Sequence, residues 1–284
     1  MDPRALRRFR KNKGALAGLV LVLTVTTLGV AGPWLAPHDP NRQFRDTLVL
    51  ADGLPAGPGS VPGHLLGGDP LGRDELSRLM YGARVSMTVA YAATALAVLI
   101  GVLVGLVSGY LGGLVDGALM RFVDVVLSMP FLLLAIAMQR VWSAPGLWVL
   151  CLVLGVLSWT TLARVTRAKT LEARNHDYVA AARALGYPHR RVLLRHVLPN
   201  VAGPIIAIAT IMVAQMILAE SALSFLGLGV RPPTASWGSM LSEAGGLVLG
   251  MPRLVVYPSI FIAAAVFGFN LFGEGLRDAL DPKE

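Results

Sequence analysis

Residues 178–200 have the sequence YVAAARALGYPHRRVLLRHVLPN and lie between two long apolar stretches of the chain. The segment is basic, and its residue types predict two helices joined by a tight turn. We expect the first helix over Tyr178–Leu185, with Asp177 as its N-cap and Gly186 in the left-handed conformation that ends it. A helix of about two turns is marginal in isolation. This charged helix between apolar stretches therefore indicates a docking element held outside a membrane.

The second helix of this segment is expected to start around Pro188, which suits a first helical turn, and to end at Leu198-Pro199. In the first helix, four alanines offer a small and flat face for contact: Ala180, Ala181, Ala182 and Ala184. The alternative is a solvated loop whose arginines only mark the cytoplasmic side of a membrane. The start and stop signals favour the ordered helix-turn-helix.

Apolar stretches dominate the rest of the chain. Of 284 residues, 55% are hydrophobic and only 15% are charged, against about a quarter in a soluble domain. A membrane span needs roughly 20 apolar residues. The charge-free stretches are 14–37, 85–115, 125–139, 141–163, 196–219 and 254–273. The third is short, and it reaches span length only if Arg121 and Asp124 join its first turn, where their spacing allows them to pair. The sequence therefore predicts an all-α integral membrane protein with six transmembrane helices.

Lysine and arginine are distributed unevenly, and this asymmetry sets the orientation of a membrane protein. Six of them precede the first span and eight lie in residues 164–195, whereas residues 32–84 contain five together with six acids. Both termini are therefore expected to be cytoplasmic, and the net charge of +8 reflects topology rather than a nucleic-acid partner. The predicted regions are a basic cytoplasmic N-terminus (1–13), the first span (14–37), an extracytoplasmic segment (38–84) and a core (85–284) with the cytoplasmic loop 164–200.

Local patterns predict how the spans are shaped and packed. Small residues recur at every fourth position of the second span, at Ala93, Ala97, Gly101, Gly105 and Gly109. This stripe favours close helix packing, and the alternative is that it lines a passage. We expect Met129-Pro130 to kink the third span. Asp74 and Arg78, four residues apart, suggest a short outer helix within Leu71–Tyr81.

Ionisable side chains are rare in the spans, which makes each one a functional candidate. Glu220 lies near the outer end of the fifth span, with neutral polar residues near it in that span and one in the sixth. The candidate passage or gate residues are Gln215, Glu220, Ser224 and Asn270. The alternative is that Glu220 forms hydrogen bonds with a neighbouring helix or lies exposed at the membrane interface.

Residue patterns for enzyme chemistry are missing from the sequence. None of the four lysines follows a glycine, so the sequence has no P-loop, and any ATP hydrolysis that drives this protein must come from a partner. The five histidines lie outside the spans, except that His196 touches the start of the fifth, so no buried nucleophile and base are expected. His189 and His196 could share a helix face, but a third ligand is missing and Cys151 is the only cysteine. We expect no catalytic residues, no metal site and no cofactor on this chain.

The helix-turn-helix resembles the EAA motif of permease subunits of ATP-binding-cassette (ABC) importers. Ala181, Ala182, Gly186, Leu198 and Pro199 match that motif, and Ala180 stands where glutamate is usual. The resemblance implies a type I ABC importer permease fold whose coupling helix inserts into a cleft on an ATPase subunit. The implied coupling residues are Tyr178, Val179, Ala180, Ala181, Ala182, Arg183, Ala184, Leu185, Gly186 and Tyr187.

Residues 64–86, 220–241 and 270–282 further resemble dipeptide and oligopeptide importer permeases, with departures at Gly68 and Pro70. The resemblance is to the second, shorter-loop permease of the pair. It implies a multi-pass protein of the bacterial cytoplasmic (inner) membrane, in contact with membrane lipid. The implied partners are a second homologous permease in a heterodimer, two ATPase subunits that bind ATP and Mg²⁺, and an extracytoplasmic peptide-binding protein.

Two other functions stay open at this stage. The same family includes permeases for nickel, glutathione or other small solutes, and substrate choice there belongs largely to the binding protein. Outside the family, the alternative is an ion-coupled carrier. Such carriers often show internal repeats and several intramembrane ionisable or unwound sites, whereas this sequence has no clear repeat and one such residue.

Overall fold

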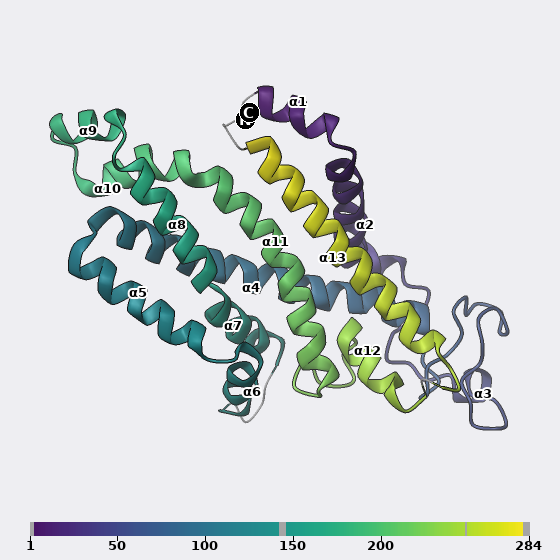
Figure 1. The fold of residues 1–284 in the computed structure, drawn as a ribbon. Helices are drawn as coiled ribbons and strands as arrows, with labels where there is room; N and C mark the ends of the chain where they lie inside the picture. The colour runs from purple at the N-terminus through teal and green to yellow at the C-terminus, as the bar shows by residue number, and fades with distance from the viewer. Residues whose placement is uncertain (1–2, 142–145, 248, 281–284) are drawn as a thin grey trace.

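The computed structural model describes residues 3–141, 146–247 and 249–280, and Figure 1 shows that this part of the chain is built from helices. Its extended contacts are isolated antiparallel bridges between residues 43 and 74. In chain order the helices are α1 (Pro3–Lys11), α2 (Lys13–Leu35), α3 (Arg45–Leu48), α4 (Glu75–Leu111), α5 (Gly113–Ser128), α6 (Phe131–Val141), α7 (Leu147–Ser158), α8 (Thr160–Ala173), α9 (Asp177–Ala184), α10 (His189–Val192), the π-helix η1 (Leu193–Val197), α11 (Leu198–Phe225), α12 (Trp237–Ala244), the 3-10 helix η2 (Gly245–Leu247) and α13 (Arg253–Leu280).

Four stretches are long and apolar enough to cross a membrane as unbroken helices. They are α2, α4, the continuous helix from α10 to α11, and α13. The α5–α6 pair is bent by 89° and the α7–α8 pair by 42°, so there are up to six spans if each bent pair counts as one. This arrangement confirms the all-α membrane class. It corrects the boundaries of the fourth predicted span, 141–163, because its second half continues as α8 to Ala173.

The sharpest bend lies at Met129 and Pro130, where the sequence predicts a kink. Pro130 has no N–H to donate to a helical bond, and Met129 has an extended backbone with ψ of 134°. The predicted pairing of Arg121 with Asp124 is wrong, because Asp124 forms its ion pair with Arg164 of α8 instead. The bend therefore separates two helices, α5 and α6, and α5 is held against α8 by a charge contact.

The small residues of α4 allow α8 to approach its backbone closely. A Cβ built on Gly101 would lie 2.8 Å from the carbonyl oxygen of Trp159, and one on Gly105 would lie 2.5 Å from the Cβ of Thr166. Both distances are too short for a real side chain, so each glycine is required by its neighbour. The stripe is thus a helix-packing surface, and the alternative of a passage along it is not supported.

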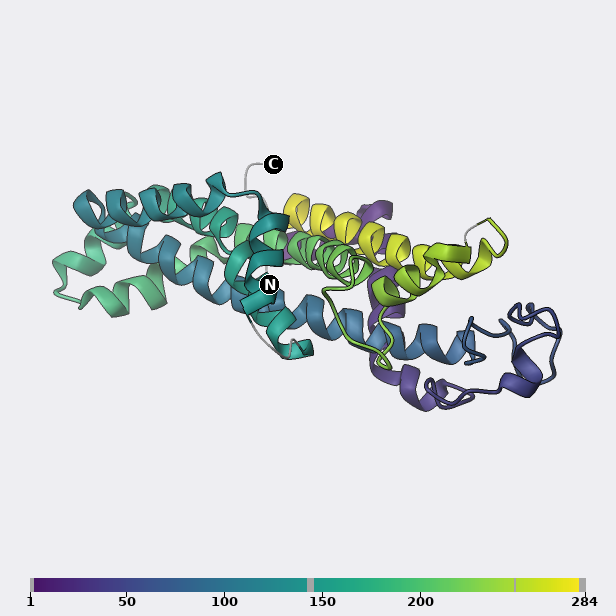
Figure 2. The same ribbon diagram turned by 90° about the horizontal axis from the view of Figure 1, so that it is seen from below.

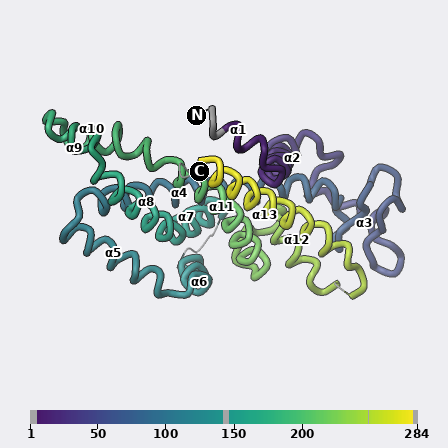
Figure 3. The backbone as a smooth tube through the Cα atoms, turned by 45° about the horizontal axis from the view of Figure 1, so that its top comes forward, coloured from purple at the N-terminus to yellow at the C-terminus, as the bar shows by residue number. Residues whose placement is uncertain are grey.

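The start of α2 and the end of α13 lie on the same side of the molecule. The Asn12 amide nitrogen is 3.4 Å from an Asp278 carboxylate oxygen, which places the start of α2 beside the end of α13. In Figure 1 this side also carries α9, while α3 and α12 lie toward the opposite corner, and Figures 2 and 3 likewise place α9 and α3 at opposite ends of the molecule. We call the end with α9 the inner end and the end with α3 and α12 the outer end. An even number of crossings fits this arrangement.

The outer end of α4 begins directly after the segment that follows α2. The Asp74 side chain accepts hydrogen bonds from the Ser77 N–H (2.9 Å) and hydroxyl (2.6 Å), and so caps the helix. From Glu75 the helix continues without a break to Leu111. The expectation of a short outer helix within Leu71–Tyr81 is therefore wrong, because residues 71–74 precede α4 and residues 75–81 are the first part of this 37-residue helix.

Candidate functional site

The start of α9 differs in detail from the prediction. The N-cap position is held by His176, whose side chain makes no capping bond. Asp177 is the first helical residue, so its assignment as N-cap is wrong. Its negative charge still lies in the first turn, where the helix dipole favours it.

The end of α9 is a complete glycine stop. Gly186 has a φ of +78°. Its N–H donates to the carbonyl of Arg183 (2.9 Å), and the Tyr187 N–H donates to the carbonyl of Ala182 (3.2 Å). These two bonds form a Schellman motif, which confirms the predicted stop. A Cβ at Gly186 would meet nothing within 4 Å, so glycine is needed there for its backbone conformation alone.

The two faces of α9 have different surroundings. Val179 and Ala182 are buried and join the inner hydrophobic core. Ala180, Ala181 and Ala184 are exposed. The expected face of four alanines is therefore corrected to three, because Ala182 points into the protein. The exposed face is bare backbone and methyl groups, a surface that another protein can approach closely.

Two larger side chains border this exposed alanine face. Leu185 is 72% exposed and Tyr178 is 39% exposed. Partial burial raises the pKa of the Tyr178 phenol, so the group stays neutral near pH 7. Exposed apolar groups beside small residues are typical of a protein contact surface.

The helix after the turn begins at His189, with Pro188 in the N-cap position before it. It does not end at Leu198-Pro199, so that prediction is wrong. Instead α10, η1 and α11 form one helix over His189–Phe225. Pro199 lies in the first turn of α11, right after the π turn, where the hydrogen-bond ladder already changes register. The turn after α9 therefore leads directly into a membrane-spanning helix.

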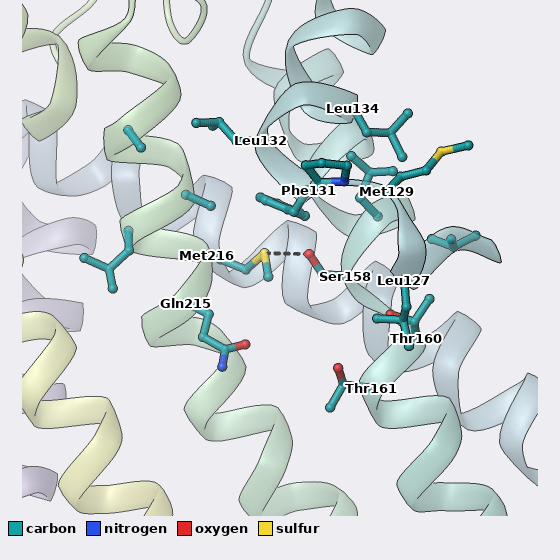
Figure 4. A pocket seen from close by; sticks show the side chains of 16 residues that line it. Leu127, Met129, Phe131, Leu132, Leu134, Ser158, Thr160, Thr161, Gln215 and Met216 are labelled. Carbon is teal, nitrogen blue, oxygen red and sulfur yellow. Dashed lines mark hydrogen bonds between the residues drawn. The ribbon is translucent and has the colours of Figure 1, made fainter. Parts of the chain in front are cut away.

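A large cavity opens beside the α5–α6 bend, with a volume of about 710 Å³. It is lined by residues of α5, α6, α7, α8 and α11. Its polar lining residues are Ser158, Thr160, Thr161 and Gln215, and the other lining residues are apolar. In Figure 4 the side chains of Gln215 and Thr161 face the same open space from α11 and α8. The cavity combines an apolar wall with a few uncharged hydrogen-bonding groups.

The four candidate passage residues lie in different surroundings. Gln215 is exposed and lines the cavity. Glu220 and Ser224 are buried, and the Ser224 hydroxyl donates to the Glu220 carboxyl group at 2.7 Å. Asn270 is half-buried in α13 and does not line this cavity. The structure therefore brings Glu220 and Ser224 together, but it does not gather all four around one space.

Glu220 connects three elements at the outer half of the molecule. The Ser86 hydroxyl of α4 donates to its carboxyl group at 2.9 Å. Ser86 in turn accepts the backbone N–H of Trp237, the first residue of α12, at 3.3 Å. Trp237 is fully buried, and its indole N–H donates to the carbonyl of Leu79 at 3.2 Å. These contacts match the alternative in which Glu220 is hydrogen-bonded to a neighbouring helix.

A buried charge cluster lies further out. Arg73 and Arg78 both pair with Glu243 of α12, at 2.6 and 2.8 Å. The same two arginines pair with Asp69, at 2.5 and 3.3 Å. Both arginines are almost fully buried. The cluster ties the segment before α4 to α12, across more than 160 residues of sequence.

A second polar cluster contains three groups whose ligand atoms lie within 4.8 Å of one another: His38, His64 and Asp74. His64 Nδ1 lies 2.8 Å from an Asp74 carboxylate oxygen. The two imidazole rings are tilted to each other, with centroids 4.4 Å apart and planes 31° apart. The backbone N–H of His38 donates to the Ser77 hydroxyl at 3.0 Å. The cluster therefore links the segment after α2 to the start of α4.

Two features of this site have no clear signal in the sequence. The cavity depends on which helices face each other, and of its lining only Pro130, as a helix breaker, and Gln215, as a polar residue in a span, could be found in advance. Glu243 carries no local pattern that links it to Arg73 and Arg78. Its position as an isolated acid between two predicted spans is the one hint that could have pointed to it.

The sequence matches two family models. Residues 97–284 match the binding-protein-dependent transport system inner membrane component, and residues 4–52 match the N-terminal TM domain of oligopeptide transport permease C. The chain is 42% identical to the dipeptide transport system permease protein DppC of Escherichia coli strain K12, over 97% of this chain and 91% of that protein. It is 40% identical to the di/tripeptide transport system permease protein DppC of Pseudomonas aeruginosa strain UCBPP-PA14, over 97% and 90%.

Solved structures with a similar fold include the MetNI methionine ABC transporter in inward-facing conformations. One of these has a TM-score of 0.60 and 18% identity, and it covers 72% of this chain and 96% of that chain. A second crystal form gives a TM-score of 0.58 and 17% identity over the same shares. At this identity the likeness is one of fold, and it agrees with the helix arrangement described above.

Proposed function

The chain belongs to the family of binding-protein-dependent transport system inner membrane components, and we propose that it is the permease subunit of an ATP-driven importer of di- and oligopeptides. It is a multi-pass membrane protein and a transport permease. The peptide substrate is inferred from full-length relatives, which are permeases of dipeptide, di/tripeptide and oligopeptide transport systems. Nickel and glutathione are the rival substrates within this kind of transporter.

The proposed assembly contains a second homologous permease, two ATPase subunits and an extracytoplasmic peptide-binding protein in a bacterial inner membrane. ATP and Mg²⁺ are bound and used by the ATPase subunits, because this chain has no P-loop sequence. The chain itself is proposed to act without a cofactor and without catalytic residues. The sides of its membrane-spanning helices that face the bilayer contact membrane lipid.

The cavity beside the α5–α6 bend is proposed to be this subunit's half of the passage. It lies next to Gln215 and the break at Pro130, and its lining residues carry no charge. A peptide importer has to pass side chains of either charge and of many sizes. A wall that offers apolar contact and uncharged hydrogen bonds suits that task, because it repels neither acidic nor basic peptides.

The observation that carries the coupling role is the asymmetry of α9. Val179 and Ala182 hold the helix to the protein, while Ala180, Ala181 and Ala184 are exposed on its opposite side. The helix is stopped by Gly186 and is followed after four residues by a helix that spans the membrane. Force applied to the exposed face is therefore delivered to a long helix through a short, well-defined turn.

In the proposed cycle, the binding protein delivers a peptide to the outer end. ATP closes the ATPase dimer and moves α9 together with the helices on either side of it, α8 and α11. These helices also line the cavity, so their tilt changes which end of the passage is open. ATP hydrolysis and product release restore the starting arrangement.

Reconstitution of the complete complex in proteoliposomes tests this proposal. We expect uptake of a labelled dipeptide that requires ATP and the binding protein. An otherwise identical complex whose ATPase subunits cannot hydrolyse ATP is the control, and it should fail to accumulate peptide. Uptake by this subunit alone in response to an ion gradient would contradict the importer assignment. ATP-dependent uptake of nickel or glutathione in place of peptide would keep the importer and correct the substrate.

A further inference from the structure

Tyr110 lies in the last turn of α4 and is buried, with 4% of its surface exposed. The guanidinium carbon of Arg183, on α9, lies 4.8 Å from the centre of its ring. The phenol oxygen lies 3.1 Å from Nδ1 of His189, at the start of α10. The His189 ring also meets the Tyr110 ring edge to face, with centroids 5.6 Å apart. One side chain of α4 thus contacts both the coupling helix and the helix that follows it.

The backbone at the same place contacts a third element. Arg174, which follows α8, donates from Nη1 to the carbonyl oxygens of Gly109 (3.0 Å) and Tyr110 (3.5 Å). The last carbonyls of a helix lack partners within it, so this guanidinium caps the inner end of α4. Gly112 leaves room for it, because a Cβ there would lie 2.9 Å from Nη1 of Arg174. The ends of α4, α8, α9 and α10 therefore meet around Tyr110.

The routes from α9 to the outer end differ in continuity. The route through α8 passes a bend of 42° at Trp159 before it reaches α7. The route through α10 passes the π turn Leu193–Val197 before it reaches α11. By contrast α4 is one helix of 37 residues, about 55 Å long at 1.5 Å per residue. Its outer end carries Arg78, which pairs with Glu243 of α12.

We propose that Tyr110 is a positioning residue through which movement of α9 reaches α4 directly, so that this unbroken helix carries the movement to the outer end of the passage. The inference rests on the proposed function, because it assigns a path for the movement that an ATPase imposes on α9. It adds α4 to α8 and α11, the two helices on either side of α9, as a third helix that the movement of α9 reaches. A change at Tyr110 therefore alters coupling while the docking face of α9 stays intact.

The test uses the whole complex in proteoliposomes and measures peptide transported per ATP hydrolysed. Tyr110→Ala removes both side-chain contacts, and we expect this ratio to fall about tenfold, within the range of coupling free energies between sites. Tyr110→Phe keeps the ring under Arg183 and loses the bond to His189, so we expect a smaller fall of about threefold. His189→Ala removes the same hydrogen bond and also the ring contact, so its ratio should fall at least as far as that of Tyr110→Phe. The double variant Tyr110→Phe with His189→Ala should fall little further than His189→Ala alone, because the hydrogen bond is shared.

Tyr91 provides the matched control on the same helix. Its hydroxyl bonds to the Thr26 hydroxyl at 2.7 Å, and it lies about 28 Å along the helix from Tyr110. Tyr91→Phe and Tyr91→Ala should leave the transport ratio at the wild-type value. A merely structural role of Tyr110 would reduce the yield of complex and leave the ratio per assembled complex unchanged.

The possible outcomes separate this inference from the function on which it rests. No ATP-driven uptake by the wild-type complex would overturn the proposed function. Wild-type uptake with Tyr110→Ala equal to Tyr91→Ala would overturn the role of Tyr110 alone. If Tyr110→Ala fails to assemble, Tyr110→Phe and His189→Ala decide the question, and an unchanged ratio in both would overturn it.

Discussion

The outer and inner ends of the molecule are held together by different kinds of contact. At the outer end Arg78 is fully buried, and it pairs with Glu243 at 2.8 Å and Asp69 at 3.3 Å. At the inner end α9 is held by two buried apolar side chains, Val179 and Ala182, and by ring contacts. Removing one member of a buried ion pair costs about 3–5 kcal/mol, whereas a cation–π contact with an exposed cation, such as Arg183 over the Tyr110 ring, contributes about 0.5–1 kcal/mol.

This difference indicates that the outer and inner ends of α4 have different roles. The outer end is a fixed assembly in which the segment before α4, α12 and the outer part of α11 are joined by buried polar bonds. The inner end presents a helix with few internal contacts and an exposed face, which the proposed contact with the ATPase would cover. Substitutions at the outer end should therefore lower stability, and substitutions around α9 should change function in a protein that still folds.

The largest effect is expected for Arg78→Ala. It leaves Glu243 and Asp69 with one arginine instead of two, and we expect a loss of about 3 kcal/mol in the free energy of unfolding. Denaturant unfolding in detergent, followed by the reactivity of the buried Cys151 thiol, measures this loss. Arg84→Ala, at an exposed position of the same helix, should change stability by at most about 0.5 kcal/mol. Equal stabilities of the two variants would contradict the inference that the outer end is a fixed assembly.

The next effect concerns Glu220, which accepts hydrogen bonds from Ser86 and Ser224. Glu220→Ala leaves both hydroxyls without their acceptor, and we expect a loss of about 1–3 kcal/mol. Glu220→Gln keeps an acceptor oxygen and should retain most of the stability. The same thiol assay compares the two variants. If Glu220→Ala is as stable as wild type but abolishes transport, Glu220 belongs to the passage and not to the outer assembly.

Gly186→Val should act at the inner end. A β-branched residue resists the positive φ of this position, and the left-handed conformation costs a non-glycine residue about 1–2 kcal/mol. We expect loss of peptide uptake in a complex that still inserts and assembles. Gly186→Asn is the control, because asparagine tolerates the left-handed region, and it should retain most of the uptake. Normal uptake by Gly186→Val in a stable complex would refute the coupling role of this turn.

The smallest effect is expected for Ala180→Glu, which restores the residue usual in the EAA motif. Ala180 is exposed on the docking face, so the free energy of unfolding should change by no more than about 0.5 kcal/mol. A new carboxylate can strengthen binding to an ATPase surface that presents a cation, and affinity measurements between the separated subunits detect this. Destabilisation beyond 1 kcal/mol would mean that position 180 faces the protein and that the assignment of the α9 faces is wrong.

Local chemistry explains which parts of this account could be predicted from the sequence. The stop at Gly186 and the break at Pro130 were predictable, because each depends on the backbone of one residue. The orientation of Ala182 was not, because in a run of alanines the sequence gives no hydrophobic period that distinguishes the two faces. Contacts such as Tyr110 with His189 join residues 79 apart, and no local pattern records them. The predicted helix after Pro188 ends at Pro199, whereas the observed helix continues through this residue. It can continue because proline is tolerated in the first turn of α11.

Cysteine crosslinking between α9 and the ATPase subunit tests whether the exposed face of α9 docks on the ATPase. In a Cys151→Ala background, single variants Ala181→Cys and Ala184→Cys place a thiol on the exposed face, and Val179→Cys places one on the buried face. In the assembled and transporting complex, we expect crosslinks from positions 181 and 184 to cysteines in the ATPase cleft, and none from position 179. Crosslinking from position 179 alone, or from no position on α9 in a complex that transports peptide, would contradict it.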